Sequence, residues 1–371
     1  MKRLTALAWI AALCLGLLVY SLLDVPKEAE PVSSGSPQLQ QTLEAAQTGL
    51  SVYVQDLQAR AAWAAAAGSY STLIDCEVTL SDTPEAAQVM VFTALSQARS
   101  WADRCVDLSA TVAYAQLVNW DLAAQRDGTV YGLPLEMEGH GLICNTHLLA
   151  GHYAVSEIQD FSKLEEVVDE LSRSAVKPFA SADPAVLARL LLSLPEGGRA
   201  LADLFLDNGG TFSTTGVQEL VRSQAVFCFG STAELTEDIS LDILPLCLDH
   251  ADVQDQTLCV TGRQYLCIRG NVSGEQTAAA MALLDLLVLP QEDGTTPLDL
   301  LGRLSPYRQT TFTSNAPEQS LREDLAAGKG CLVLIEQAPE GAKEALLAYQ
   351  QDRTDENWAK FLAFRRSSQT T

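Results

Sequence analysis

Polar side chains follow three short apolar segments of the chain and are suited to hold a ligand. Asp56, Thr93 and Ser231 each lie within two residues of the end of such a segment. If the segments are strands of an open α/β sheet, these residues lie at the carboxyl ends of the strands, where such sheets bind ligands. A carboxylate only accepts hydrogen bonds, so it suits a hydroxyl-rich ligand. These residues therefore predict a binding site for a small molecule.

Trp120 is a further candidate for ligand contact. It stands in the polar stretch Asn119-Trp120-Asp121, and its ring could stack on a sugar or on another apolar ring face. The competing interpretation is that Trp120 packs against the body of the protein.

The sequence contains no motif that predicts catalysis. His140, Cys144 and His147 are close enough to suggest a metal site, but no set of carboxylates completes one, so we expect no metal and no cofactor. Nucleophile elbows, phosphate-binding glycine loops and His-Glu-x-x-His motifs are absent. A pair of glycosidase carboxylates could be chosen only arbitrarily. We therefore predict no catalytic residues and no enzyme.

The charge of the chain narrows the choice of partners. The 371 residues include 47 acidic side chains against 24 Lys and Arg, a net charge of −23. Such a surface repels phosphate backbones and anionic lipid headgroups, so we expect no nucleic-acid partner. Self-repulsion favours a monomer. Hydrophobic residues make up 47% of the chain, which suffices for a core, and the length favours two lobes.

The first residues predict export from the cytoplasm. Met1-Lys2-Arg3 precedes the uncharged stretch 4–23, which as a helix would be about 30 Å long, the thickness of a bilayer core. The basic flank places the rest of the chain outside the cytoplasm. Residues 1–24 are therefore a retained anchor, a cleaved signal peptide or, through Cys14, a lipoprotein signal. Residues 25–48 read as a flexible stalk.

The cysteines favour a thiol-containing core. None of the nine belongs to a Cys-x-x-Cys pair. Cys228 and Cys267 lie inside apolar runs, and free cysteine is a common core residue. We expect mostly unpaired thiols. One disulfide is an alternative, because exported proteins can form disulfides.

Strand and helix patterns alternate along the chain and predict an α/β fold. Expected strands are 52–54, 73–80, 89–92, 225–229, 241–248 and 265–268. Expected helices are 57–67, 186–194, 278–289 and most of 321–366. A further helix is expected to begin at Ser162, which with Glu165 has the spacing of a capping box.

Several segments together resemble a known family. Tyr131-Gly132-Leu133-Pro134 followed by Gly139-His140-Gly141-Leu142-Ile143-Cys144-Asn145 is similar to the hinge segment of maltose-binding-like solute receptors of ABC importers. Later features follow in the family's order: Asn208-Gly209-Gly210, the strand ending at Ser231, the returning strand 265–268 and the helix 278–289. The resemblance covers roughly residues 49–366.

The resemblance implies a two-lobed periplasmic-binding-protein-like fold of type II. Residues 49–131, with 265–305, would form the first lobe, and residues 132–264, with 306–366, the second. Glu136 would lie in the crossing between the lobes, and Tyr265, Tyr307 and Arg308 would face the cleft from the returning segments. The implied function is an extracytoplasmic receptor that captures a small solute and delivers it to the membrane subunits of an ABC permease.

The solute class stays open at this point. Relatives that bind carbohydrates often carry Trp soon after the turn at 230–231, but here the run is Ser231-Thr232-Ala233-Glu234. A carbohydrate is therefore one candidate beside amino acids, peptides, polyamines and metals. A membrane-anchored sensory ectodomain is the alternative function, and a secreted hydrolase is a third.

Overall fold

The computed structural model describes residues 49–151, 153–158, 160–174, 176–194, 198–235, 241–244, 258–289, 304–307 and 331–368. These residues belong to one compact unit, 48–371. The predicted signal or anchor segment and the stalk lie outside the described residues. Within the described ranges, no helix has the length and apolar character needed to cross a membrane.

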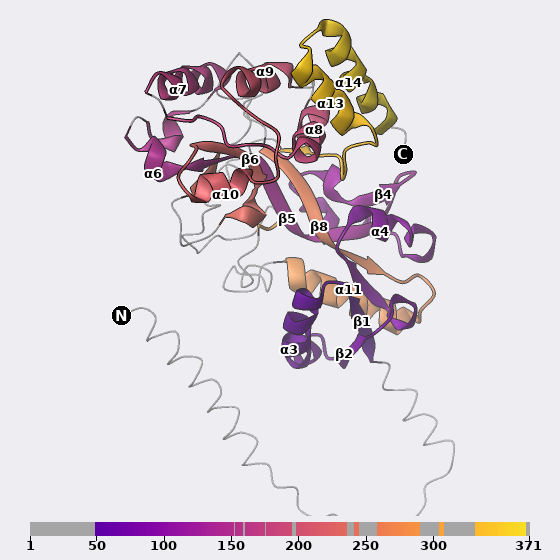
Figure 1. Ribbon diagram of the computed structural model, residues 1–371. Helices are drawn as coiled ribbons and strands as arrows, with labels where there is room; N and C mark the ends of the chain where they lie inside the picture. The colour runs from indigo at the N-terminus through magenta and orange to yellow at the C-terminus, as the bar shows by residue number, and fades with distance from the viewer. Residues whose placement is uncertain are drawn as a thin grey trace, which may run out of the picture. The chain divides into compact units, whose positions relative to one another are not determined.

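Three parallel strands form one edge of the sheet. β1 (Leu50–Val54) lies between β2 (Val78–Ser81) and β3 (Val89–Phe92). All four residues of β3 are buried, as its continuous apolar sequence predicts for a strand covered on both faces. Helices α3 (Leu57–Leu73) and α11 (Gly274–Val288) pack on these strands (Figure 1).

Two long antiparallel strands extend the sheet and connect its parts. β5 (Thr129–Asn145) and β8 (Leu258–Ile268) pair with each other over much of their length. β8 also pairs with β3 near its end and with β9 (Cys331–Val333) near its start. β5 pairs in addition with β4 (Ala124–Arg126), β6 (Phe227–Ser231) and β7 (Leu241–Leu244). The result is a mixed sheet, which confirms the α/β class.

Most other helices gather around β6 and the end of β5 that contacts it (Figure 1). They are α6 (Thr146–Leu149), α7 (Phe161–Arg173), α8 (Pro184–Ser193), α9 (Arg199–Asp207), α10 (Gly216–Val221), α13 (Ala342–Gln351) and α14 (Asp355–Ser368). Shorter elements are α4 (Leu95–Arg99), α5 (Val112–Ala115) and the 3-10 turns η3 (Trp120–Leu122) and η5 (Thr232–Glu234).

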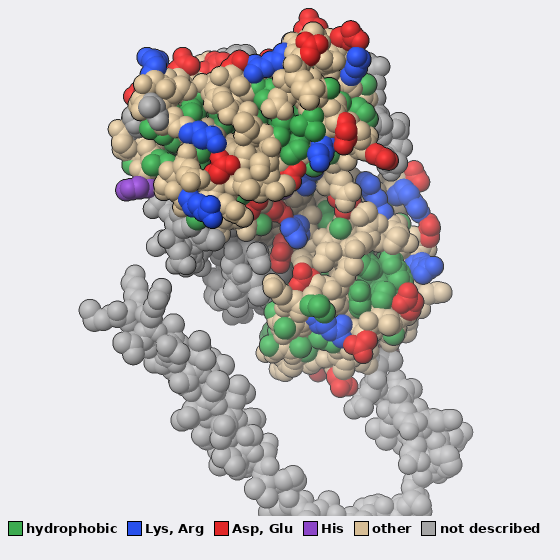
Figure 2. Space-filling view, viewed as in Figure 1, with side chains coloured by type: hydrophobic (Ala, Val, Ile, Leu, Met, Phe, Trp, Pro, Cys, Tyr) green, Lys and Arg blue, Asp and Glu red, His purple; other side chains and the backbone are tan. Residues whose placement is uncertain are grey.

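Buried side chains form two main groups. The first core surrounds β1, β3, α3 and α11 and includes Trp63 and Met90. The second core surrounds β6, α7 to α9, α13 and α14, where Phe179 packs with Phe205 and Phe229. Burying each such ring contributes about 1.5–3 kcal/mol. Figure 2 shows acidic and basic side chains interspersed over the visible face, so the acidic excess forms no single patch there.

Two details of the predicted elements are wrong. The start of the expected strand 73–80 is wrong: β2 begins only at Val78, because α3 runs to Leu73 and a turn with positive φ at Asp75 precedes the strand. The capping box at Ser162 is also wrong, since α7 begins one residue earlier. Asp160 caps it by accepting a hydrogen bond from the backbone N–H of Lys163 at 2.7 Å.

Other expected elements are found with shifted ends. The strand expected at 225–229 is β6, displaced by two residues, and the strand expected at 265–268 is the last third of β8. The expected helix 321–366 contains strand β9 before α13 and α14. Cys144, Cys228 and Cys267 are buried and carry free thiols, as predicted for core cysteines.

Candidate functional site

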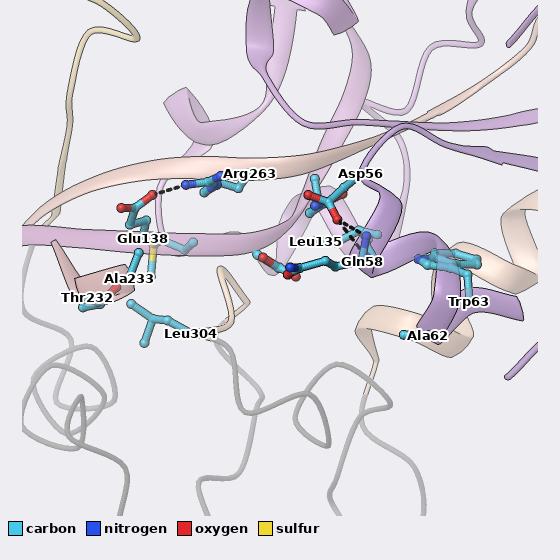
Figure 3. Close-up of a pocket in the computed structure, with 14 residues that line it drawn as sticks. Asp56, Gln58, Ala62, Trp63, Leu135, Glu138, Thr232, Ala233, Arg263 and Leu304 are labelled. Atoms are coloured by element: carbon cyan, nitrogen blue, oxygen red, sulfur yellow. Dashed lines mark hydrogen bonds and ion pairs between the residues drawn. The ribbon is translucent and has the colours of Figure 1, made fainter. Parts of the chain in front are cut away.

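A cavity of about 470 Å³ lies where α3, β5, β8 and η5 approach one another. One wall is made by the first turns of α3: Asp56, Gln58, Ala59, Ala62 and Trp63. The floor is made by the two long strands: Leu135, Glu136, Met137, Glu138, Arg263 and Gln264. Thr232, Ala233 and Leu304 close the other end. Figure 3 shows Asp56, Gln58 and Trp63 at one end and Glu138, Thr232 and Leu304 at the other.

Asp56 belongs to the cavity because it caps α3. Its backbone is extended, and its Oδ1 accepts hydrogen bonds from the backbone N–H groups of Gln58 and Ala59, each at 2.8 Å. A carboxylate at this place satisfies orphan donors of the helix and is favoured by the helix dipole. The cap therefore fixes the Asp56 carboxylate at the rim of the cavity.

Glu138 and Arg263 form an ion pair on the floor. Arg263 Nη1 donates to Glu138 Oε2 at 2.7 Å, and the Ser231 hydroxyl donates to Glu138 Oε1 (Figure 3 shows the ion pair). Burial opposes ionisation of Glu138, but the hydrogen bonds from Ser231 and Arg263 outweigh it and lower the pKa of Glu138. The pair is ionised at neutral pH and presents the half-exposed Arg263 guanidinium to the cavity.

Beyond Glu138, strand β5 continues into a buried polar group. His140 Nε2 lies 2.8 Å from Thr261 Oγ1, and Arg189 Nη2 lies 3.1 Å from His140 Nδ1. Burial and the Arg189 guanidinium lower the pKa of His140 to about 4, so the ring is neutral at pH 7. His140 thus supports the β5–β8 pairing beside the cavity and is not among its lining residues.

The cavity has a lining that is mixed in charge and polarity. It combines carboxylates at Asp56, Glu136 and Glu138 with one guanidinium, two amides and the indole of Trp63. Its volume lies within the range of about 300–1,000 Å³ that small-molecule sites occupy. Among the described residues, no three His, Cys, Asp or Glu side chains are placed to hold a metal ion.

Three of the residues predicted from sequence lie at or beside this cavity. Asp56 and Glu136 line it directly. Ser231 is buried and reaches the site through its hydrogen bond to Glu138. Thr93 lies elsewhere, since its hydroxyl bonds to Gln97 Oε1 at 2.8 Å and its backbone N–H to Gln55.

The other predicted residues are not brought to the cavity. Trp120 is 61% exposed on η3 and stacks on Tyr114 with ring centroids 6.2 Å apart. Tyr265 is buried in the first core opposite Phe92. Tyr307 is also buried there and donates from its hydroxyl to the backbone oxygen of Pro134 at 2.7 Å. Arg308 lies outside the described residues.

The lining residues that sequence reasoning missed include Trp63, Glu138, Arg263 and Gln264. Trp63 carried a usable signal, because it is the first aromatic residue of an alanine-rich helix that begins beside Asp56. Arg263 and Glu138 carried none, since their meeting depends on the register of β5 against β8.

The described chain was compared with known proteins. No family model matches the chain, and no curated protein matches its sequence. Solved structures do match. Apo RafE from Streptococcus pneumoniae has a TM-score of 0.66 at 12% identity, covering 86% of this chain and 98% of RafE. A probable secreted solute-binding lipoprotein from Streptomyces coelicolor has a TM-score of 0.63 at 13% identity, covering 87% of this chain and 98% of its own.

A third match decides the fold. A family 1 extracellular solute-binding protein from Bifidobacterium longum subsp. infantis has a TM-score of 0.61 at 13% identity, covering 87% of this chain and 97% of its own. This chain has the fold of a family 1 solute-binding protein. The match extends over nearly the whole length of each of these three structures. The resemblance suggested by 131–134 and 139–145 is confirmed. RafE in complex with raffinose also matches, with a TM-score of 0.57 at 12% identity, over 86% of this chain and 100% of that one.

Proposed function

We propose that this chain is a noncatalytic, extracytoplasmic receptor of an ABC importer, which captures a neutral solute in the cavity between α3, β5, β8 and η5. The observation that carries the proposal is this cavity, with its mixed polar and aromatic lining, in a chain that has a solute-binding-protein fold. The partners are the solute and the membrane subunits of the permease.

The cavity chemistry favours a sugar over an anion. Three lining carboxylates, Asp56, Glu136 and Glu138, face one lining guanidinium, Arg263. An anionic solute would be repelled by this excess, whereas a sugar can donate hydroxyl hydrogens to the carboxylates and accept from Arg263. Trp63 adds an apolar ring, which suits the hydrophobic face of a sugar. RafE, which was solved with raffinose, gives the same indication by analogy of fold.

The mechanism that we propose is closure of two lobes around the solute. The first and second cores would be the interiors of the lobes, and β5 and β8 would be the crossings between them. Tyr307, which the boundaries predicted from the sequence assign to the second lobe, lies in the first core. Closure then reports occupancy to the permease because the solute stabilises the closed state.

The location belongs to the same proposal. The basic start and the uncharged stretch 4–23 favour export, and the body would act outside the cell membrane, either anchored by its N-terminal segment or released from it. Neighbours described as extracellular or secreted support an extracytoplasmic site of action.

Isothermal titration calorimetry with raffinose, galactose, maltose, xylobiose, amino acids and dipeptides tests the proposal. We expect micromolar or tighter binding of at least one saccharide, weakened at least tenfold by Asp56→Asn or Glu136→Gln. Asp169→Asn, which changes an exposed carboxylate of α7, is the matched control and keeps the wild-type affinity. Silence of the wild type toward every saccharide would overturn the proposal.

A further inference from the structure

Gln264 has a backbone conformation that strands rarely contain. Its φ is 55°, in the left-handed region, where residues other than glycine are strained. Among the described residues other than glycine, Asp75, Asp127 and Ser223 also have positive φ. All three lie in turns. Gln264 alone among them lies inside a strand, β8. Strained residues of this kind gather at functional sites.

The strained residue lies at the cavity. Successive side chains of a regular strand point to opposite faces of the sheet. Here the consecutive residues Arg263 and Gln264 both line the cavity. The next residue, Tyr265, is turned so that a Cβ added to Gly262 would lie 2.5 Å from its hydroxyl oxygen. The left-handed residue interrupts the regular strand geometry at the cavity, and both Arg263 and Gln264 belong to the cavity lining.

Gln264 also has an amide oxygen that is left without a hydrogen-bond partner in the described part of the chain. It is 8% exposed, and its Oε1 is the one buried side-chain atom of the cavity lining that has no hydrogen-bond partner among the described residues. Buried amide oxygens are nearly always bonded, so an orphan at a cavity wall indicates a group that the cavity's occupant satisfies. Backbone strain and an orphan acceptor meet in one residue.

We propose that Gln264 is a specificity-determining residue, whose amide oxygen accepts a hydrogen bond from a hydroxyl group of the bound solute. The inference rests on the proposed function and deepens it, because it requires a solute that brings a donor to this point of the floor. Arg263 beside it supplies donors to solute oxygens. Gln264 would accept a hydrogen bond from one hydroxyl of the solute, and Arg263 would donate to a neighbouring oxygen of the solute. A polyhydroxylated, neutral ligand offers this pattern of donor and acceptor.

Two variants separate the acceptor from the strain. Gln264→Met keeps the length of the side chain and the strained backbone but removes the acceptor. Gln264→Gly removes the side chain and relieves the strain. Asp127→Gly relieves the same strain in the exposed turn between β4 and β5 and is the matched control. The probes are raffinose, galactose, maltose and xylobiose, titrated calorimetrically into the full chain, with urea unfolding measured on each variant.

We expect Gln264→Met and Gln264→Gly to weaken binding of the recognised saccharide at least tenfold, while Asp127→Gly keeps the wild-type affinity. Gln264→Gly should retain the wild-type urea midpoint, as Asp127→Gly does, because relief of strain offsets the greater freedom of the unfolded chain. Wild-type affinity in both Gln264 variants overturns this inference and leaves the proposed function standing. A wild type that binds none of the four probes overturns both. A large drop in the midpoint of Gln264→Gly alone shows that the residue serves the fold and also overturns the inference.

Discussion

At the scale of single residues, two contacting thiols differ in how readily they ionise. Cys105 packs against the first core, where Cys267 is fully buried. The hydrogen bond from Cys267 lowers the pKa of the Cys105 thiol, assisted by the Arg269 guanidinium and opposed by burial. The same hydrogen bond and burial raise the pKa of Cys267. Burial also raises the pKa of Cys144 and of Cys228 to about 12.

Cys105 should therefore react first with an alkylating reagent, since the thiolate is the reactive form. Brief iodoacetamide labelling of the folded chain at pH 7.5, read by peptide mass spectrometry, is expected to modify Cys105 at least tenfold faster than Cys144, Cys228 or Cys267. Cys105→Ser removes the fast site and serves as the control. Faster labelling of any of the three buried thiols contradicts the assignment.

The titration of His140 makes the free energy of unfolding depend on pH. This dependence lies at higher pH than the range in which carboxylates titrate. Burial and Arg189 lower its folded pKa from 6.5 to about 4. The unfolded chain therefore takes up a proton near pH 6.5 that the folded chain refuses until about pH 4. Stability from this group is complete above pH 6.5 and is lost as the pH falls from 6.5 to 4. Between pH 7 and pH 5 the loss amounts to about 2 kcal/mol.

Urea unfolding at several pH values between 7 and 5 measures this loss. His140→Gln should be less stable than the wild type at pH 7, yet should lose about 1–2 kcal/mol less on going to pH 5. His147→Gln, which removes an exposed histidine from α6, is the matched control. An unchanged pH dependence in His140→Gln would refute the role of this ring.

At the scale of elements, close approach between strands explains a glycine of β5. A Cβ at Gly141 would lie 2.3 Å from the backbone oxygen of Leu244 in β7. Gly141→Ala should therefore push the strands apart and destabilise the fold by about 1–3 kcal/mol. Gly68 in α3 has nothing within 4 Å of such a Cβ. Gly68→Ala should instead stabilise by about 0.5–1 kcal/mol, because alanine favours helix. Thermal and urea unfolding of both variants check the opposite signs, and a loss of stability in both would contradict this account.

Elements with a strong local signal were predictable from the sequence. Segment 89–92 is continuously apolar and is a fully buried strand, as expected. Boundaries were less predictable, because several residues can serve each local role. Asp160, and not Ser162, caps α7. Strand β8 begins seven residues before the apolar segment from which it was predicted. The turn at Asp75 depends on where α3 stops, which tertiary packing decides.

Sequence alone could predict only those residues of the candidate site that lie at the end of a strand or in the crossing segment. Asp56 was found because it follows β1, and Glu136 because it lies in a recognisable crossing segment. Arg263 and Glu138 meet through pairing of two strands more than a hundred residues apart in sequence. The positive φ of Gln264 is set by the surrounding sheet and has no signature in the residue itself. Long-range register therefore limits what sequence alone can tell.

At the scale of the whole molecule, one carboxylate joins the two cores. Glu336 follows β9 and the buried Leu334 of the second core. Its carboxylate accepts hydrogen bonds from the backbone N–H of Ser96 at 3.0 Å and from the Ser96 hydroxyl at 3.1 Å, in the helix α4 that packs on the first core. Arg189 of α8 donates to the backbone oxygen of Glu336 at 3.3 Å. If the conformation is the ligand-free one, this contact stabilises the open receptor.

Removing the contact should then shift the equilibrium toward the closed, solute-binding state. Glu336→Ala is expected to bind the recognised saccharide about three- to tenfold more tightly, which corresponds to about 1 kcal/mol, the usual contribution of such hydrogen bonds. The ligand-free variant should also have a smaller radius of gyration in X-ray scattering than the ligand-free wild type. Calorimetry and scattering thus report the same shift independently.

The exposed Glu340 of the same loop offers the matched control, since Glu340→Ala removes an equal charge and leaves Ser96 bonded. Tighter binding in both variants would mean that charge alone governs affinity. Weaker binding in Glu336→Ala, with wild-type affinity in Glu340→Ala, would place the Ser96 contact in the closed state instead. The sign of the change therefore tells which state this contact stabilises, because a contact made equally in both states leaves the affinity unchanged.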